Sequence, residues 1–211
     1  MKQKPFSLDC LIKMKKKNNK SKQFFIVGID EVGRGAVAGP LVLGAAAGYL
    51  NNKNKKFLIG IKDSKKLTFN QRLLWYEKFK DSDLNFYCVF INNHFIDKYG
   101  MGKALKEGVK RLLKKIDKKI DLVLLDGGLK APEQYNQKTI IRGDDKVPFI
   151  SAASVYAKVK RDFYMIKMDK KINYCFAEHK GYGTKEHFLL IKKNGISKIH
   201  RKSFLKNIVK T

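Results

Sequence analysis

Two apolar runs near the start of the chain, at residues 24–29 and 40–47, constrain the fold more than any other feature. Runs of this length bounded by glycines are typical of buried strands, and the glycines between them suit a turn. We therefore predict that the two runs pair as a hairpin. The first run ends in two adjacent acids, Asp30 and Glu31. Because neighbouring strand residues point to opposite faces, these carboxylates can share a site only if the strand breaks between or just after them.

The rest of the chain alternates between strand and helix patterns. Apolar residues recur every three or four positions within residues 105–116 and again after Pro148, and Thr68 suits the N-cap of a helix at residues 68–80. Further strands are expected at residues 85–91, 122–126 and 139–141. This order predicts an α/β fold in which helices flank a mixed five-stranded sheet, with a helical C-terminal portion.

Positive charge dominates the composition. Lys and Arg outnumber Asp and Glu by 46 to 19, which makes the formal net charge +27. Such a surface attracts polyanions over roughly a Debye length, about 8–10 Å in physiological salt. Residues 1–23 hold eight Lys and one acid and so account for seven of these charges. We predict that they form a basic, flexible extension, and that residues 24–211 form one domain with most of the positive charge.

Several classes of protein are disfavoured by what the sequence lacks. Residues 1–23 contain no apolar core of signal-peptide length, and no run approaches the ~20 apolar residues of a membrane span, so we predict a cytosolic protein without a membrane partner. Its three cysteines, Cys10, Cys88 and Cys175, are odd in number and widely spaced, which argues against disulfides and zinc knuckles. The histidines also lack close metal-ligand spacing. Any metal should therefore be a hard cation held by oxygen atoms.

Four acids follow apolar strands at Gly-containing turns: Asp30, Glu31, Asp126 and Asp144. From such positions side chains can converge at one end of a sheet. In so basic a chain, neighbouring carboxylates need protonation, solvent or a cation to relieve their repulsion. Two hard cations about 3.5–4 Å apart can activate a water on one side of a phosphodiester and stabilise the departing oxygen on the other. The four acids together therefore indicate metal-dependent phosphodiester hydrolysis.

A series of ordered motifs across residues 24–205 resembles the ribonuclease HII family. The motifs are residues 28–35 (GIDEVGRG), 38–40 (AGP), 62–67 (KDSKKL), 126–127, 143–162, 179–184 (HKGYGT) and 199–204 (IHRKSF). The resemblance implies an RNase H-like fold for a catalytic domain at residues 24–211. It also implies that Asp30, Glu31, Asp126 and Asp144 are catalytic and bind Mg²⁺ or Mn²⁺, as a two-metal site.

The resemblance extends to the substrate. It implies cleavage of the RNA strand of RNA–DNA hybrids, and of duplex DNA beside single embedded ribonucleotides, leaving 5′-phosphate and 3′-hydroxyl ends. The backbone of Gly33, Arg34 and Gly35 is then expected to read the ribose 2′-hydroxyl, which distinguishes RNA from DNA. Tyr182 is expected to pack against the sugar on the DNA side of an RNA–DNA junction.

Phosphate contacts are expected from a second group of residues: Lys62, Ser64, Lys65 and the basic side of a helix at residues 149–171. Such contacts orient a duplex without reading its sequence. Within that helix the basic positions outside the apolar stripe are Lys158, Lys160, Arg161 and Lys167. Asp162 is expected to form a supporting ion pair beside Arg161 and not to ligate metal.

Two alternatives remain open. A basic nucleic-acid-binding protein without catalysis would explain the charge, but it needs no acids at strand ends. A ribonuclease HIII-like nuclease would share the fold, but it needs an additional N-terminal domain that residues 1–23 are too short to form. We expect a monomer.

Overall fold

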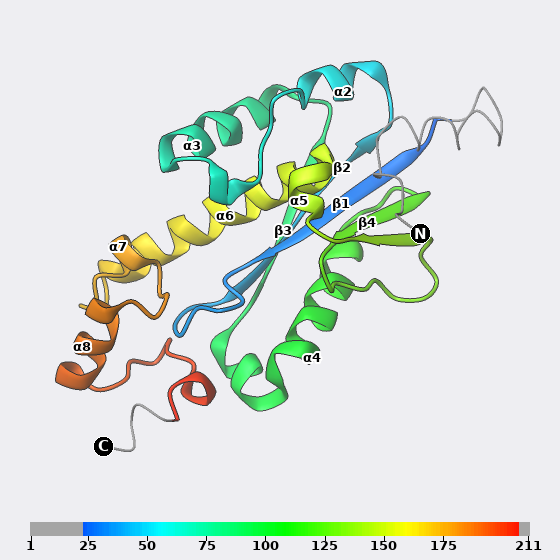
Figure 1. Cartoon of the computed structure of the whole chain (residues 1–211). Coiled ribbons are helices and arrows are strands. Elements are labelled where there is room, and N and C mark those ends of the chain that lie inside the picture. Colours follow the sequence, from blue (N-terminus) through cyan, green and yellow to red (C-terminus); the bar gives the residue numbers. More distant parts are fainter. Residues whose placement is uncertain (1–22, 207–211) are drawn as a thin grey trace, which may run out of the picture.

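A mixed sheet of five strands forms the centre of the molecule, in the order β3-β2-β1-β4-β5 (Figure 1). The computed structural model describes residues 23–206, so most of the predicted extension at residues 1–23 lies outside the described residues. The strands are β1 (Phe25–Val32), β2 (Leu41–Tyr49), β3 (Asn85–Ile91), β4 (Leu122–Asp126) and β5 (Gln137–Ile140). The predicted mixed five-stranded sheet is confirmed.

The strand pairing also confirms the predicted hairpin. β2 pairs antiparallel with the whole of β1, from Phe25 and Tyr49 to Val32 and Val42. On its other edge β1 runs parallel to β4, but this ladder stops earlier, at the pair of Ile29 and Leu125. β1 therefore remains a strand for three residues beyond its last partner in β4.

Helices cover both faces of the sheet. They are α2 (Asn52–Phe57), α3 (Phe69–Lys78), α4 (Asn93–Leu113), α5 (Gly143–Lys146), α6 (Pro148–Asp169), α7 (Phe176–His179) and α8 (Lys185–Asn194), with 3₁₀ turns at Ser64–Lys66, Phe79–Asp81 and Lys202–Phe204. α3 begins as predicted, because the Thr68 side chain caps it and Gln71 completes a capping box. None of the helices within residues 23–206 has the length and apolar character to cross a bilayer.

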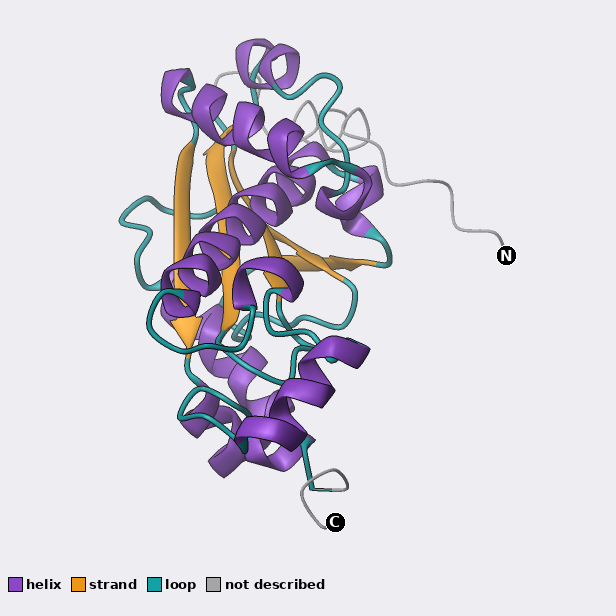
Figure 2. Cartoon of the chain, turned by 90° about the vertical axis from the view of Figure 1, so that its left-hand side faces the viewer, coloured by secondary structure: helices purple, strands orange, loops and turns teal. Residues whose placement is uncertain are grey.

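α6 and α4 lie on opposite faces of the sheet (Figures 1 and 2). Ile26 and Leu124 pack on the α6 side, whereas Val27 and Ile29 pack on the α4 side. Gly28 allows the close approach of α6, because a Cβ there would lie 2.4 Å from the Phe149 carbonyl carbon. Alternating residues of β1 are thus buried on both faces, which explains the continuous apolar run.

A smaller apolar cluster joins the C-terminal segments to the far end of α6. Phe176 and Met165 are fully buried in it, together with Ile191 of α8. A single bridge between Ala38 and His200 ties this portion to the loop between β1 and β2. The helical C-terminal portion therefore packs against the segment that carries Gly33, Arg34 and Gly35.

The predicted basic face of α6 is partly wrong. Arg161 is completely buried and Asp162 is 1% exposed. Asp162 forms the expected supporting ion pairs, with Lys158 at 2.7 Å and with Arg72 at 3.7 Å. The helical periodicity failed here because the C-terminal portion covers this side of α6.

Candidate active site

Asp30, Glu31 and Asp126 lie at the point where the parallel pairing of β1 with β4 ends. The two strands stop pairing at Ile29 and Leu125, just before these acids. Alternation along the strands puts Asp30 and Asp126 on the α6 side, with Glu31 on the α4 side. β1 does not break between Asp30 and Glu31, since Glu31 still pairs with Leu43 of β2, but it ends just after them, at Val32. The ladder between β1 and β4 ends before the acids, and the resulting gap brings them together.

The carboxylates raise one another's pKa values. Burial raises the pKa of Asp30 well above its usual value, and the charges of Glu31 and Asp126 raise it further. Burial also raises the pKa of Glu31, where Arg34, at 3.6 Å, opposes the shift and Asp126 adds to it. The pKa of Asp126 is raised by burial and by Asp144. The site therefore gathers negative charge where water screens it poorly.

Asp144 joins this group from a short helix. It was predicted at a turn after a strand, but it lies in the first turn of α5 and is 5% exposed. Asp126 accepts hydrogen bonds from the backbone N–H groups of Gly143, at 2.6 Å, and Asp144, at 3.4 Å. The N-terminus of α5 thus holds the Asp126 side chain in place.

Lys65 supplies the positive charge nearest to these acids. Its Nζ lies 3.1 Å from an Asp144 carboxylate oxygen. Burial opposes the charged form of Lys65, but Asp144, Asp63 and Asp30 outweigh it and raise the pKa of Lys65. Asp63 also caps the 3₁₀ turn by accepting from the Lys65 backbone N–H at 2.9 Å. The 62–67 motif therefore places an ammonium group beside the acids.

Ser64 and Lys62 occupy different places from Lys65. Ser64 is 2% exposed, and its hydroxyl lies 2.8 Å from that of Ser154 on α6, which in turn contacts Asp30. Ser64 therefore supports the site through Ser154. A phosphate contact would require an exposed side chain, and Ser64 is not exposed. Lys62 is exposed and lines a separate hollow beside α3, formed with Lys66 and Gln71.

The donor set fits a hard divalent cation. Within residues 23–206, no three His, Cys, Asp or Glu side chains lie close enough together to hold a metal ion. Asp126 bonds backbone amides and Asp144 pairs with Lys65. The acids themselves are oxygen donors of the kind that Mg²⁺ and Mn²⁺ prefer. Their shared repulsion is what a bound cation would relieve. Asp30, Glu31, Asp126 and Asp144 are the residues that would hold it.

The turn formed by Gly33, Arg34 and Gly35, called here the GRG turn, follows the acids after Val32 and packs on Arg161. Gly33 has φ of +88°, and a Cβ there would lie 2.2 Å from the Arg161 Nε. Arg161 donates hydrogen bonds to the carbonyls of Pro40, at 3.0 Å, Ala38, at 3.1 Å, and Lys180, at 2.8 Å. It therefore binds the loop between β1 and β2 to the loop that carries Tyr182.

A second buried arginine supports the same turn. Arg201 donates to the carbonyls of Arg34, at 2.9 Å, and Gly39, at 3.0 Å. Burial and, to a smaller extent, the charge of Arg161 together lower the pKa of Arg201 to about 9. The backbone of the GRG turn is thus fixed at its second residue, while the side chain of Arg34 remains exposed.

Tyr182 lies beside these arginines, half-buried. The Arg161 guanidinium is 5.2 Å from the centre of its ring, and the Lys158 Nζ is 5.7 Å away. Both distances suit cation–π contacts. The structure therefore brings Tyr182 and the GRG turn together through Arg161.

Comparisons with known proteins agree with this arrangement. Residues 27–207 match the family model described as Ribonuclease HII. The chain belongs to the ribonuclease HII family. Ribonuclease HII from Prochlorococcus marinus (strain MIT 9215) is 44% identical over 184 residues, which cover 85% of this chain and 89% of the relative. The ribonuclease HIII alternative is not favoured.

Solved structures share the fold. Ribonuclease H2 from Pyrococcus horikoshii OT3 superposes with a TM-score of 0.71 at 27% identity, covering 89% of this chain and 100% of that one. A Bst-RNase HIII structure in complex with Mn²⁺ has a TM-score of 0.60 at 15% identity, covering 83% of this chain and 64% of that one. The latter likeness shows the fold alone.

Sequence reasoning missed part of this ribonuclease HII site. It did not anticipate that Arg161 and Arg201 are buried supports, or that Lys65 pairs with Asp144. Both arginines do fall within the family motifs at residues 143–162 and 199–204. Their place in a motif was the available signal, since nothing in their local pattern predicts burial.

Proposed function

We propose that this ribonuclease HII cuts the RNA strand of RNA–DNA hybrids and cuts beside single ribonucleotides in duplex DNA. The proposal rests on one observation, the gathering of Asp30, Glu31 and Asp126 where β1 and β4 part, next to the GRG turn. Hydrolysis would leave 5′-phosphate and 3′-hydroxyl ends. The net charge of +27 favours a polyanionic substrate of this kind.

Asp30, Glu31, Asp126 and Asp144 would hold Mg²⁺ or Mn²⁺. When bound, one or two such ions supply charge stabilisation at the phosphate and lower the pKa of an attacking water. The protein fixes the carboxylates in advance: α5 amides hold Asp126, and the Ser154 hydroxyl contacts Asp30. Lys65, which lies beside Asp144, would contact a substrate phosphate, and the exposed Lys62 would contact the duplex further out.

Recognition of RNA is assigned to the GRG turn. The backbone of the exposed residues Arg34 and Gly35 would hydrogen-bond the ribose 2′-hydroxyl, and the buried Gly33 sets the turn that presents it. Tyr182 would pack against the following deoxyribose. Because Arg161 contacts both segments, the distance between the two sugar contacts is held constant.

The decisive experiment uses duplex DNA that carries one ribonucleotide. We expect a single cut beside the ribonucleotide with Mg²⁺ or Mn²⁺, and none in EDTA or with an all-DNA duplex. Asp126→Asn should lower the rate by at least about 10²-fold, because it removes a charged ligand. Undiminished cleavage by this variant would refute the roles assigned to the acids, and binding without cleavage would favour the alternative of a nucleic-acid-binding protein.

Tyr182→Ala tests the sugar contact separately. We expect it to reduce cleavage at the RNA–DNA junction more than cleavage of a long hybrid. An unchanged ratio between the two substrates would contradict the role of Tyr182. We further propose that the enzyme acts as a cytosolic monomer, which gel filtration and cell fractionation would test.

A further inference from the structure

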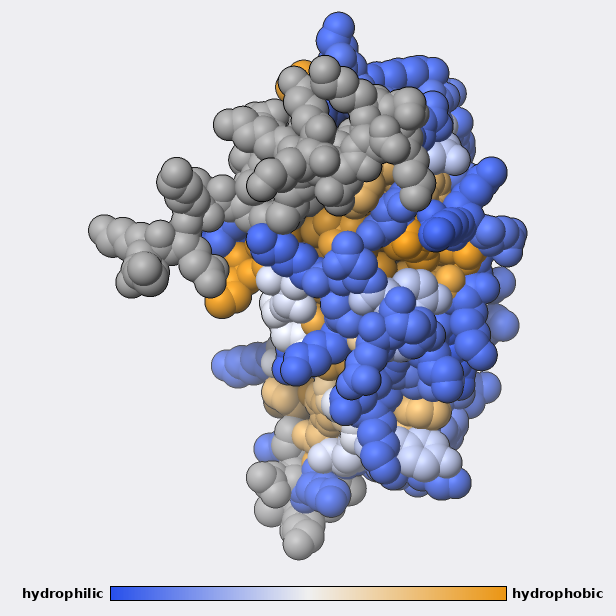
Figure 3. All heavy atoms as spheres, turned by 90° about the vertical axis from the view of Figure 1, so that its right-hand side faces the viewer, coloured by the Kyte–Doolittle hydropathy of each residue, from blue (hydrophilic) through white to orange (hydrophobic). Residues whose placement is uncertain are grey.

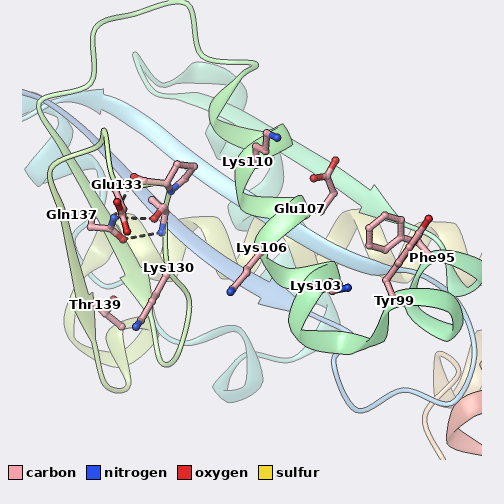
Figure 4. Close-up of a pocket in the computed structure, with 12 residues that line it drawn as sticks. Phe95, Tyr99, Lys103, Lys106, Glu107, Lys110, Lys130, Glu133, Gln137 and Thr139 are labelled. Atoms are coloured by element: carbon pink, nitrogen blue, oxygen red, sulfur yellow. Dashed lines mark hydrogen bonds between the residues drawn. The ribbon is translucent and has the colours of Figure 1, made fainter.

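A trough of about 980 Å³ opens on the α4 side of the sheet (Figure 4). One wall is α4, and the other is the segment from Lys130 to Thr139, which includes the start of β5. None of Asp30, Glu31, Asp126 and Asp144 lines the trough, so it is separate from the carboxylate site. Nothing in the proposed cleavage reaction uses it.

Two aromatic rings form one end of the trough. Phe95 and Tyr99 lie with their ring centres 4.7 Å apart, and Tyr99 is 42% exposed. Gly100 interrupts α4 with φ of +80° and ψ of 163°, so the turn that carries both rings is bent away from the rest of the helix. The kink presents an exposed aromatic surface at the mouth of the trough.

Lysines line the trough beyond the rings. Lys103, Lys106 and Lys110 recur at spacings of three and four on α4, a row about 10 Å long at 1.5 Å per residue. Lys130 faces them from the opposite wall. In the part of the chain that the structure describes, the side chains of Lys106, Lys110 and Lys130 make no hydrogen bond or ion pair. Of the two acids in the lining, Glu107 is already bonded to Arg111 at 2.7 Å.

This face of the molecule is predominantly hydrophilic. Figure 3 views it from the side of β4 and β5 and shows polar side chains over most of the described surface. A trough of this volume lies at the upper end of the ~300–1,000 Å³ range of small-molecule pockets. A row of three or four positive charges suits a chain of phosphates better than one phosphate group.

We propose that the trough binds a single strand of nucleic acid, with an unpaired base on Tyr99 and the phosphates along the α4 lysines. Aromatic rings beside a basic groove are the arrangement that binds single strands without reading sequence. Bases in a duplex are already stacked on one another, so the exposed ring selects for an unpaired strand. The site would hold a single-stranded stretch that adjoins a duplex, independently of the carboxylates.

The test measures binding of a fluorescein-labelled oligothymidylate to the full-length protein by anisotropy, in EDTA so that metal at the acids takes no part. Lys106→Glu/Lys130→Glu should weaken binding by roughly tenfold or more, and lower the slope of log K against log salt by about 0.7 for each lost phosphate contact. Tyr99→Ala should weaken it by roughly tenfold, whereas Tyr99→Phe should not.

The matched control is Lys192→Glu/Lys193→Glu on the exposed end of α8, which changes the net charge equally. Thermal unfolding confirms that each variant is folded. Equal losses of oligothymidylate affinity in the trough and control double variants would overturn the proposal, because they would show that the protein attracts the strand by its net charge alone. Equal binding by Tyr99→Ala and the wild-type protein would also overturn it, as would displacement of the oligothymidylate by polyglutamate at equal charge.

Discussion

His200 Nε2 lies 3.0 Å from His187 Nε2 inside the C-terminal cluster. The Ser197 backbone N–H donates to His200 Nδ1 at 2.8 Å, so the His200 proton is on Nε2 and is donated to His187. His187 in turn donates from Nδ1 to the Tyr182 carbonyl at 2.9 Å. This chain of hydrogen bonds requires both rings to be neutral, and it ends on the residue assigned to the sugar contact.

The histidine pair predicts loss of stability in acid. Burial lowers the pKa of His187 and of His200 to about 4, against about 6.5 in an unfolded chain. As the pH falls below 6.5, His187 and His200 become protonated in the unfolded chain but stay neutral in the folded chain. Stability should therefore be complete above about pH 6.5 and decline toward pH 4, by on the order of 2 kcal/mol for each ring.

Denaturant unfolding at about pH 7 and pH 5 measures this effect. His200→Gln should be less stable than the wild-type protein at pH 7 and should depend less on pH. His94→Gln, at an exposed position of α4, is the control and should keep the wild-type dependence. A wild-type protein equally stable at both pH values would contradict the prediction.

Gly33→Ala should destabilise the protein, by about 2–4 kcal/mol. It combines positive φ with a Cβ placed 2.2 Å from the Arg161 Nε, so both strain and a displaced buried arginine contribute. Gly35→Ala is the matched change two residues away, where a Cβ meets nothing within 4 Å. Thermal unfolding should separate the two variants clearly, and equal midpoints would show that Gly33 is not conformationally required.

Arg161→Lys should cost about 3 kcal/mol or more, although the charge is conserved. A lysine cannot reproduce the planar fork that reaches the carbonyls of Ala38, Pro40 and Lys180 at once. Lys167→Met, at an exposed position of the same helix, should change stability by less than about 0.5 kcal/mol. Chemical denaturation compares the two, and similar small losses would mean that Arg161 is not a structural tie.

Asp30→Asn should stabilise the protein in EDTA while abolishing cleavage. The substitution removes a buried charge that Glu31 and Asp126 repel, and an Asn side chain can still accept from the Glu31 backbone N–H, which now bonds Asp30 at 2.7 Å. We expect a rise in melting temperature of a few degrees. Added Mg²⁺ should raise the melting temperature of the wild-type protein more than that of the variant, and the opposite order would contradict a cation site at Asp30.

Local patterns predicted most of the secondary structure. The Thr68 cap and the long helix after Pro148 depend on contacts within a few residues, and the hairpin joins two strands that are adjacent in the chain. All three are confirmed. The four acids could also be identified from the sequence, because carboxylates after buried strands in a basic chain are unusual. Their roles came from the resemblance to ribonuclease HII and not from spacing.

Contacts between distant segments could not be predicted in this way. Nothing local shows that the β1–β4 ladder ends at Ile29, and that end decides how Asp30 and Glu31 reach one site. Nor does helical periodicity reveal that Arg161 is buried, because the segments that cover it lie beyond α6 in the sequence.

The sequence by itself thus determined the strands, the main helices and the identity of the acids, because backbone preferences and alternating burial are local properties. Only the tertiary structure decided that Lys65 pairs with Asp144, that two buried arginines hold the GRG turn, and that lysines of α4 face Lys130 across a trough. These relationships join residues far apart in the chain. Their geometry is set by how helices and sheet pack, which no single segment specifies.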